Sequence, residues 1–281
     1  IRDRRMGIVI REEDIEHIRQ IADRERAPFY VVGETTGDHR FVFEQTDGVK
    51  PIDLAMEDMF GKAPRTVMTD RTVEETYEDV TYDQTQLDEY VERVLQLEAV
   101  ACKDWLTNKV DRSVTGKIAR QQCQGEIQLP LSDCGVVALD YRGRAGIATS
   151  IGHAPQAALV DPAAGSILSI AEALTNIVWA PLSEGLDSVS LSANWMWPCK
   201  NEGEDARLYR AVEACSDFAC SLGINIPTGK DSLSMTQKYG KDKVYSPGTV
   251  IISAGAEVSD IRKVVSPVLR TGVNSTIYYL S

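Results

Sequence analysis

Hydroxyl, carboxylate and amide side chains recur at helical spacing within an otherwise apolar segment, residues 162–180. Ser166, Ser169, Glu172 and Asn176 are separated by three, three and four positions, which places them in one stripe along a helix. Because the other residues of the segment are mostly apolar or small, we expect a buried helix. A buried, ionised Glu172 then requires a cation, an Arg or Lys, or solvent as compensation. Glu172 and Asn176, one turn apart, are oxygen ligands of the kind that Mg²⁺ prefers.

A third oxygen ligand is available at Asp133. It follows the segment 128–132 and precedes the apolar run 136–139, which predicts a position at the mouth of a strand. Polar groups at such positions often take part in binding or catalysis. The residue pattern also fits a simpler interpretation, in which the stripe faces water and Asp133 caps a turn.

A second candidate site is the glycine-containing segment 228–232. It resembles the end of a phosphate-binding P-loop, but five residues separate Gly223 from Gly229, and Asp231 rather than Ser or Thr follows Lys230. A different phosphate-binding loop formed by Gly229, Lys230, Asp231 and Ser232 is possible, with backbone N–H groups and the Ser232 hydroxyl facing an oxyanion. A plain glycine turn between strands explains the same residues equally well.

The remaining sequence offers little support for other catalytic chemistry. The aromatic segment 194–199 is more typical of a core or an interface than of base stacking, and the polar segment 111–116 alone indicates only a capped turn. With three histidines and six cysteines without C-x-x-C spacing, neither a Ser-His-Asp nor a Cys-His-Glu arrangement can be assembled. The cysteines therefore suggest reduced thiols, and structural zinc is not expected.

Composition narrows the possible partners. The chain has 281 residues, 43% of them hydrophobic and 26% charged, values that are ordinary for a globular protein. Its net charge of −12 argues against nucleic-acid binding, although a divalent cation would still allow nucleotide binding. No apolar run is long enough to span a membrane.

Periodicity predicts an α/β chain with helices and strands that position these candidate residues. We expect helices over residues 11–26, 87–100, 162–180 and 204–222, and strands over 29–32, 40–43, 136–139, 145–148, 188–192, 224–226 and 248–258. The first two strands are expected to form a hairpin through residues 36–38. Residues 63–86 are acid-rich and are expected to form a solvated linker.

Several strings occur in an order that resembles one enzyme family. They are D-R-S-V-T-G (111–116), A-R-Q-Q (119–122), S-D-C-G-V (132–136), A-E-A-L-T-N (171–176), L-S-A-N-W-M (191–196), G-E-D (203–205) and G-K-D-S-L-S-M (229–235), preceded by K-P-I-D-L (50–54) and G-K-A-P-R (61–65). Together these strings resemble the large, single-chain phosphoribosylformylglycinamidine synthase of purine biosynthesis. The resemblance covers nearly the whole chain.

The resemblance implies a fold and a division into domains. The synthase core of that family is a duplicated, aminoimidazole-ribonucleotide-synthetase-like α/β (α+β) arrangement, with a mixed sheet packed against helices. We expect residues 1–65 to end the first C-terminal-type domain and 66–112 to form a linker and helix. Residues 113–257 would form the second N-terminal-type domain, and 258–281 a linker and the start of the next domain. The chain is thus expected to be an interior fragment without the glutaminase.

The resemblance also implies site residues and ligands. Asp133, Glu172 and Asn176 match the Mg²⁺ ligands of a second, structural ATP/ADP site, and Ser132 matches a backbone contact to the nucleotide. A fourth, Asp ligand would come from a downstream domain. The Gly229–Ser232 loop would reach toward the catalytic site and its phosphorylated substrate.

The implied activity is that of a cytoplasmic, ATP-dependent ligase. Formylglycinamide ribonucleotide would be converted to the amidine through an iminophosphate, with ammonia from the glutaminase. We expect the fragment to be inactive alone and to self-associate through the apolar strands that normally pair the two core domains of the family. Alternatives are a nucleotide-binding structural and assembly module without turnover and, with less support, a small-molecule module unrelated to purines.

Overall fold

The computed structural model describes residues 6–62, 64–74, 76–103, 106, 112–113 and 116–279. The chain divides into two compact units, Ile1–Thr66 and Val67–Ser281. Of the polar segment 111–116, residues 111, 114 and 115 lie outside the described residues. None of the described helices combines the length and the apolar character that a membrane crossing requires.

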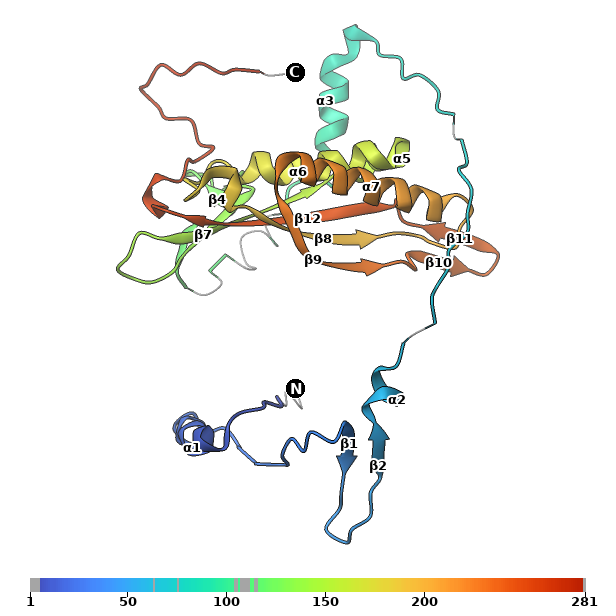
Figure 1. The fold of residues 1–281 in the computed structure, drawn as a ribbon. Helices are drawn as coiled ribbons and strands as arrows, with labels where there is room; N and C mark the ends of the chain where they lie inside the picture. The colour runs from blue at the N-terminus through green and yellow to red at the C-terminus, as the bar shows by residue number, and fades with distance from the viewer. Residues whose placement is uncertain are drawn as a thin grey trace. The chain divides into compact units, whose positions relative to one another are not determined.

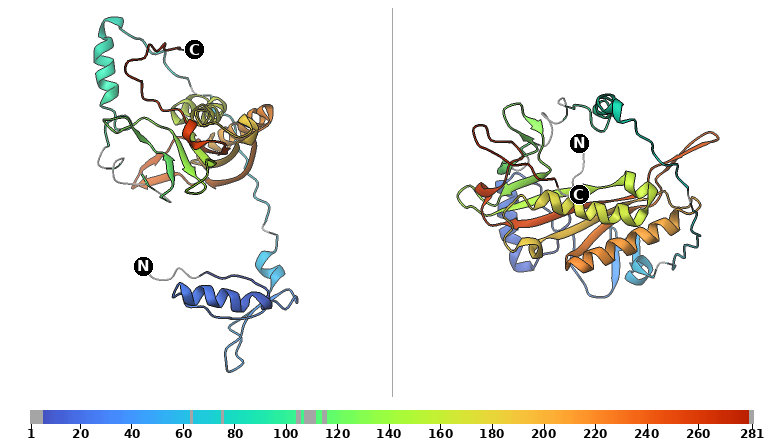
Figure 2. Two further views of the ribbon diagram at one scale, coloured as in Figure 1. Left: turned by 90° about the vertical axis from the view of Figure 1, so that its left-hand side faces the viewer. Right: turned by 90° about the horizontal axis from the view of Figure 1, so that it is seen from above.

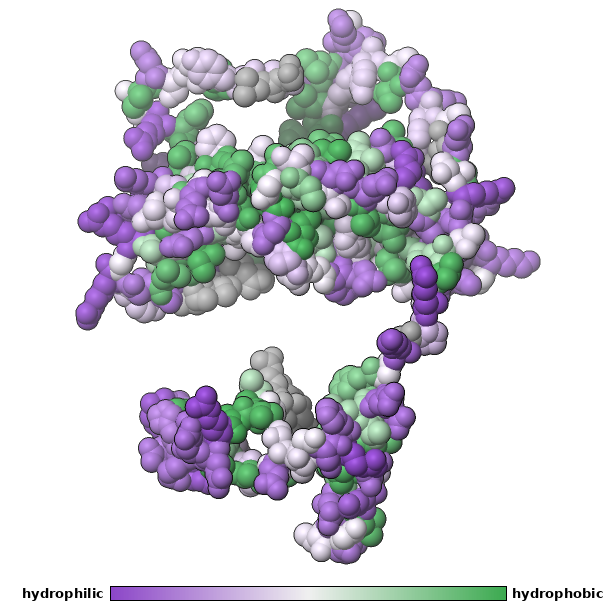
Figure 3. Space-filling model, viewed as in Figure 1, coloured by the Kyte–Doolittle hydropathy of each residue, from purple (hydrophilic) through white to green (hydrophobic). Residues whose placement is uncertain are grey.

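The first unit is a small assembly of short elements (Figure 1). These are η1 (Glu12–Asp14), α1 (Ile15–Arg24), β1 (Arg40–Phe43), β2 (Ile52–Ala55) and α2 (Met56–Phe60). Its described residues include no buried hydrophobic side chain. Figure 3 shows hydrophobic residues lying at its surface beside hydrophilic ones.

The expected hairpin through residues 36–38 is wrong. Residues 29–32 form no strand, and β1 pairs instead with β2 in an antiparallel hairpin. The turn is made around Gly48, whose φ of 79° suits glycine, and Asp47 accepts a hydrogen bond of 3.1 Å from the amide of Val49. Across the strands, the Arg40 guanidinium donates to Asp53 at 2.8 Å. The turn at Gly37 has similar local chemistry, since Asp38 accepts from the amide of Arg40 at 3.0 Å. The cross-strand pair is therefore the contact that accompanies the later hairpin.

The second unit contains one six-stranded mixed sheet, with order β3-β6-β7-β12-β8-β9, in which only β8 and β9 are parallel. Its strands are β3 (Ile118–Arg120), β6 (Cys134–Ala138), β7 (Gly146–His153), β8 (Ser190–Met196), β9 (Asn225–Ser232) and β12 (Thr249–Val258). Two small ribbons, β4 (Cys123–Gln124) with β5 (Leu129–Pro130) and β10 (Thr236–Tyr239) with β11 (Asp242–Tyr245), accompany it. The expected fold class, a mixed sheet packed with helices, is confirmed.

Helices cover one face of this sheet (Figures 1 and 2). They are α5 (Pro155–Val160), α6 (Pro162–Ile177) and α7 (Glu204–Leu222), while η2 (Gln84–Gln86), α3 (Leu87–Leu95), η3 (Gly185–Ser188) and η4 (Ile261–Lys263) lie in the connections. Asp161 caps α6 as expected, accepting from the amide of Ala163 at 2.9 Å. Gly223 ends α7 with a φ of 69°.

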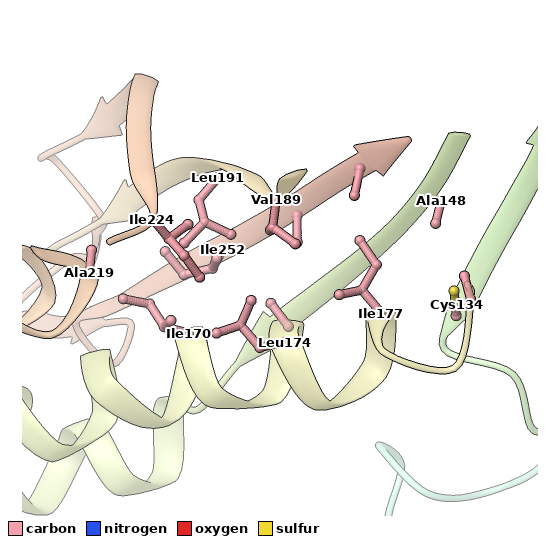
Figure 4. Close-up of a cluster of buried hydrophobic side chains, with 14 of the residues drawn as sticks. Cys134, Ala148, Ile170, Leu174, Ile177, Val189, Leu191, Ala219, Ile224 and Ile252 are labelled. Carbon is pink, nitrogen blue, oxygen red and sulfur yellow. The ribbon is translucent and has the colours of Figure 1, made fainter. Parts of the chain in front are cut away.

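The core lies between the sheet and α6. Ile170, Leu174 and Ile177 of the helix point toward Leu191 of β8 and Ile252 of β12 (Figure 4). Burial alternates strictly along β7, so every second residue faces the helices. The aromatic segment 194–199 contributes to a smaller core cluster, as its composition favoured, because Trp197 is fully buried.

The described residues of the acid-rich segment from 67 to 83 are exposed and contain no helix or strand, and the segment is also attached to α7. The Asp70 carboxylate accepts hydrogen bonds from the amides of Gly203 (3.2 Å), Asp205 (3.0 Å) and Ala206 (3.3 Å). It thereby fills the role of a capping side chain that Gly203, at the start of the helix, does not have. Further along, the Tyr77 hydroxyl donates to the carbonyl of Leu159 at 2.8 Å.

Candidate nucleotide and metal site

The predicted polar stripe on α6 separates into a buried half and an exposed half. Ser166 and Ser169 are buried, and each hydroxyl donates to the carbonyl four residues earlier, at 3.0 Å and 2.9 Å. Glu172 is exposed and Asn176 is half-buried. The expectation that Glu172 is buried is therefore wrong, because Glu172 lies on the solvent side of α6, whereas Ala173 and Leu174 of the same turn face the sheet.

Glu172 and Asn176 are held by the end of strand β7. The Glu172 carboxylate accepts a hydrogen bond of 2.5 Å from the amide of His153, and the Asn176 amide group donates to the carbonyl of Ile151 at 3.1 Å. These backbone partners alternate with Gly152, which is buried under α6. The strand therefore fixes both side chains of the pair at one end of the helix.

Asp133 lies at the same end of the sheet, immediately before β6. Cys134 pairs with Ser150 of β7, so Asp133 is next to the strand end that holds Glu172 and Asn176. Partial desolvation and then the negative charge of Glu172 raise the pKa of Asp133 above its usual value. Asp133 precedes the residue that pairs with Ser150, and Glu172 accepts from His153, so both carboxylates lie at the same end of β7. The structure thus brings all three predicted metal ligands together.

Ser132 is adjacent, but its amide is already used. It donates to the carbonyl of Gln122 at 3.1 Å, and its hydroxyl donates to the carbonyl of Cys134 at 3.1 Å. The remaining backbone acceptor is the Ser132 carbonyl. A nucleotide contact through its amide would require the bond to Gln122 to break.

The Gly229–Ser232 segment is a strand rather than the expected loop. It forms the end of β9 and pairs with Ala193 to Met196 of β8 in parallel register. A side chain at Gly229 would place its Cβ 2.6 Å from the carbonyl oxygen of Ala193, so close strand pairing explains the glycine. The Lys230 ammonium donates to the Ser232 hydroxyl, and Gly229, Lys230 and Asp231 are exposed.

The two candidate sites are separate. Strands β12 and β8 lie between β7 and β9, which places the two strands about 14 Å apart at the usual strand spacing. Sequence reasoning identified the side chains at the first site but missed the backbone groups of Ile151 and His153. Small residues alternate with larger ones along residues 146–153. This alternation was the signal in the sequence that the strand continues to His153.

The residues at the first site fit a divalent cation. Two carboxylates and one amide oxygen are hard ligands suited to Mg²⁺, and a cation would relieve the repulsion between Asp133 and Glu172. Among the described residues, no three His, Cys, Asp or Glu side chains gather into a metal cluster. Neither carboxylate has a Lys or Arg within 4.0 Å in the described part of the chain. The described residues thus supply an incomplete set of ligands, with no Lys or Arg paired to either carboxylate.

Comparison with solved structures agrees with the architecture described above. PurL from Thermotoga maritima, in a structure with ATP, superimposes with a TM-score of 0.56 at 15% identity, over 91% of this chain and 37% of PurL. The structure of PurLQS from the same organism gives a TM-score of 0.57 at 13% identity, over 91% of this chain and 38% of that chain. At these identities the likeness concerns the fold.

Sequence comparison gives stronger relationships. The human phosphoribosylformylglycinamidine synthase is 38% identical over 94% of this chain, and the Dictyostelium discoideum enzyme of the same name is 36% identical over 98% of it. The chain spans about a fifth of the length of these relatives, 21% in each case. Residues 102–257, more than half of the chain and including the whole first site, match the family described as the FGAR-AT PurM_N-like domain, and the chain belongs to that family.

Proposed function

We propose that this chain is part of a cytoplasmic phosphoribosylformylglycinamidine synthase and contributes a nucleotide-binding half-site to it. The observation that carries the proposal is the gathering of Asp133, Glu172 and Asn176 at the end of β7, within the family-matched segment. In this proposal these three side chains hold Mg²⁺, and Ser132 contacts the nucleotide through its backbone. Bound Mg²⁺ would neutralise negative charge on the phosphate oxygens of ATP or ADP.

The protein residues themselves have definable tasks in this arrangement. The His153 amide orients the Glu172 carboxylate, and the Ile151 carbonyl orients the Asn176 amide. Such partners of a ligating group fix its direction and typically change metal affinity about tenfold to a hundredfold when lost. In the full enzyme, we propose that ATP activates the amide oxygen of formylglycinamide ribonucleotide and that ammonia from a glutaminase domain displaces the phosphate.

The proposed domain assignment follows the family. Residues 1–65 would end one synthase domain, 66–112 would connect the domains, 113–257 would form the second N-terminal-type domain, and 258–281 would lead into the next. The Gly229–Ser232 segment, on the opposite edge of the sheet, would face the substrate of the complete enzyme. Its exposed Lys230 and the hydroxyl of the half-buried Ser232 support a contact with a phosphate group.

The nucleotide site is tested by calorimetry with Mg-ADP. We expect Glu172→Gln, which keeps the size of the side chain but removes its charge, to weaken binding by about tenfold or more. Glu184→Gln is the matched control, because Glu184 is an exposed carboxylate in the connection after α6. Equal affinity in the wild type and Glu172→Gln would remove Glu172 from the ligand set.

The incomplete ligand set favours a second candidate function, in which the site holds nucleotide to stabilise the fold without turnover. Both versions predict binding, but only the complete enzyme should catalyse. The purified chain with formylglycinamide ribonucleotide, ammonia and Mg-ATP should give no product above background. Robust turnover would contradict the requirement for further domains, and nucleotide-dependent thermal stabilisation without turnover would support the structural role.

A further inference from the structure

A separate pocket of about 470 Å³ lies beside β3 and the β4–β5 ribbon. Two arginines, Arg112 and Arg120, line it together with the amide side chains of Gln121, Gln124 and Gln128. It shares no residue with the candidate metal site. Its volume falls in the range of small-molecule sites in proteins.

Arg120 is fixed in place by neutral groups. One terminal nitrogen donates to the Gln124 side-chain oxygen at 2.7 Å, and the other donates to the carbonyl of Val264 at 2.8 Å. The Nε atom of Arg120 is buried and has no hydrogen-bond partner among the described residues. An unpaired buried donor on a charged group is costly unless a ligand or solvent satisfies it.

Arg112 is held in the same manner. Its Nε donates to the Gln121 side-chain oxygen at 2.8 Å, and a terminal nitrogen donates to the Gln128 side-chain oxygen at 2.6 Å. The Gln128 side chain is itself fixed, because it donates to the carbonyl of Gly125 at 2.8 Å. The glutamine amides therefore orient the guanidinium without neutralising its charge.

Among the described residues, these two arginines differ from others in having no carboxylate partner. The chain has 42 acidic and 30 basic side chains, so acidic partners are abundant. Other arginines use them: Arg40 pairs with Asp53, and Arg262 pairs with Asp260. Within the described part of the chain, no carboxylate lies within 4.0 Å of Arg112 or Arg120.

We propose that this pocket binds the phosphate group of a small phosphorylated molecule. The two guanidinium groups carry two positive charges. A phosphate dianion balances both charges, whereas a single carboxylate balances only one. Their planar, multiply donating geometry is suited to phosphate oxygens. The Ser113 residue and the glutamine amides at the wall provide further hydrogen-bonding groups. This site is independent of the proposed Mg²⁺ site, since it uses protein cations rather than a metal.

Calorimetry with inorganic pyrophosphate and the full 281-residue chain tests the proposal. The titration is done in EDTA, so that a metal site at Asp133 and Glu172 cannot contribute. We expect Arg112→Gln to weaken pyrophosphate binding by about tenfold or more. The control Arg142→Gln removes the same charge from an exposed turn and should leave binding unchanged.

A second variant and a second anion complete the experiment. Arg120→Lys keeps the charge but removes the fork of donors, and we expect weaker binding with an unchanged circular-dichroism spectrum. Malonate, a dicarboxylate, should bind more weakly than pyrophosphate. No heat at millimolar pyrophosphate, equal binding by the wild type and Arg112→Gln, or a preference for malonate would each overturn the proposal.

Discussion

The contact between Gly152 of β7 and helix α6 gives a quantitative prediction for Gly152→Ala. A Cβ atom at this position would lie 1.9 Å from the carbonyl oxygen of Ser169 and 2.5 Å from the amide nitrogen of Ala173. An ordinary contact begins near 3.4 Å, so helix and strand would have to separate by about 1.5 Å. Because both colliding atoms belong to the helix backbone, no side-chain rotation relieves the clash.

The expected destabilisation follows from this geometry. Overpacking of a core costs about 1–3 kcal/mol, and separation from the sheet also weakens the contacts of Ile170, Leu174 and Ile177. A Gly-to-Ala change in a compatible conformation stabilises by about 0.4–1 kcal/mol through the unfolded chain. We therefore expect a net loss of about 2 kcal/mol, which corresponds to a fall in Tm of about 4–8 °C for a unit of this size.

Tryptophan fluorescence during urea and thermal unfolding provides the measurement. All four tryptophans belong to the second unit, so the signal reports on that unit alone. Gly255→Ala is the matched control, because Gly255 lies in the neighbouring strand β12 and an added Cβ there meets no atom within 4 Å. If Gly152→Ala and Gly255→Ala were equally stable, the close approach of β7 to α6 would be refuted.

Two further predictions concern the linker and the thiols. Asp70→Ala should lower the Tm of the second unit, whereas Glu74→Ala, a change at an exposed carboxylate nearby, should not. Hydrogen bonds from backbone amides lower the pKa of Asp70, so its contribution is present above pH 3.8 and is lost as the pH falls through its folded value; acid titration of both variants measures this. Burial raises the pKa of Cys134 and Cys215 from 9.0 to about 11. Their stabilising effect is complete below pH 9.0 and is lost as the pH rises toward 11, which alkaline unfolding curves should show. In the native state a thiol reagent should label the exposed Cys102 and Cys220 rapidly and the buried cysteines only on unfolding.

The predicted role of Asp70 and the predicted thiol labelling can each be contradicted by a single result. Equal acid sensitivity of the wild type and Asp70→Ala would show that the carboxylate does not act as a cap. Rapid labelling of three or more thiols in the native protein would contradict the burial of Cys123, Cys134, Cys199 and Cys215.

Strong local signals in the sequence predicted the second unit well. The apolar periodicity of residues 204–222, with a glycine after it, indicated α7 with its observed ends, and the long apolar run indicated β12. The Asp161-Pro162 pair located the start of α6. The ends of these helices and strands are set by residues that are close together in the sequence, which is why they could be predicted without the structure.

Features that depend on distant residues were not predictable. The pairing of β1 with β2 depended on which of two turns formed, and the exposure of Glu172 depended on where α6 passes the end of β7. The Gly229–Ser232 segment has the composition of a turn, but pairing with β8 extends it into a strand. The sequence nevertheless identified Asp133, Glu172 and Asn176, which the fold places at one end of β7. The evidence was the polar stripe, the aspartate before a strand, and the strings shared with the family.

The capping of α7 by Asp70 affects how this protein should be divided for study. The family-matched segment begins at residue 102, and a fragment cut at that boundary would omit the carboxylate that satisfies three amides at the start of a 19-residue helix. Such a fragment would retain the whole sheet yet leave those donors to water. An excised version of this unit should therefore begin before Asp70, near residue 67, where the compact unit itself begins.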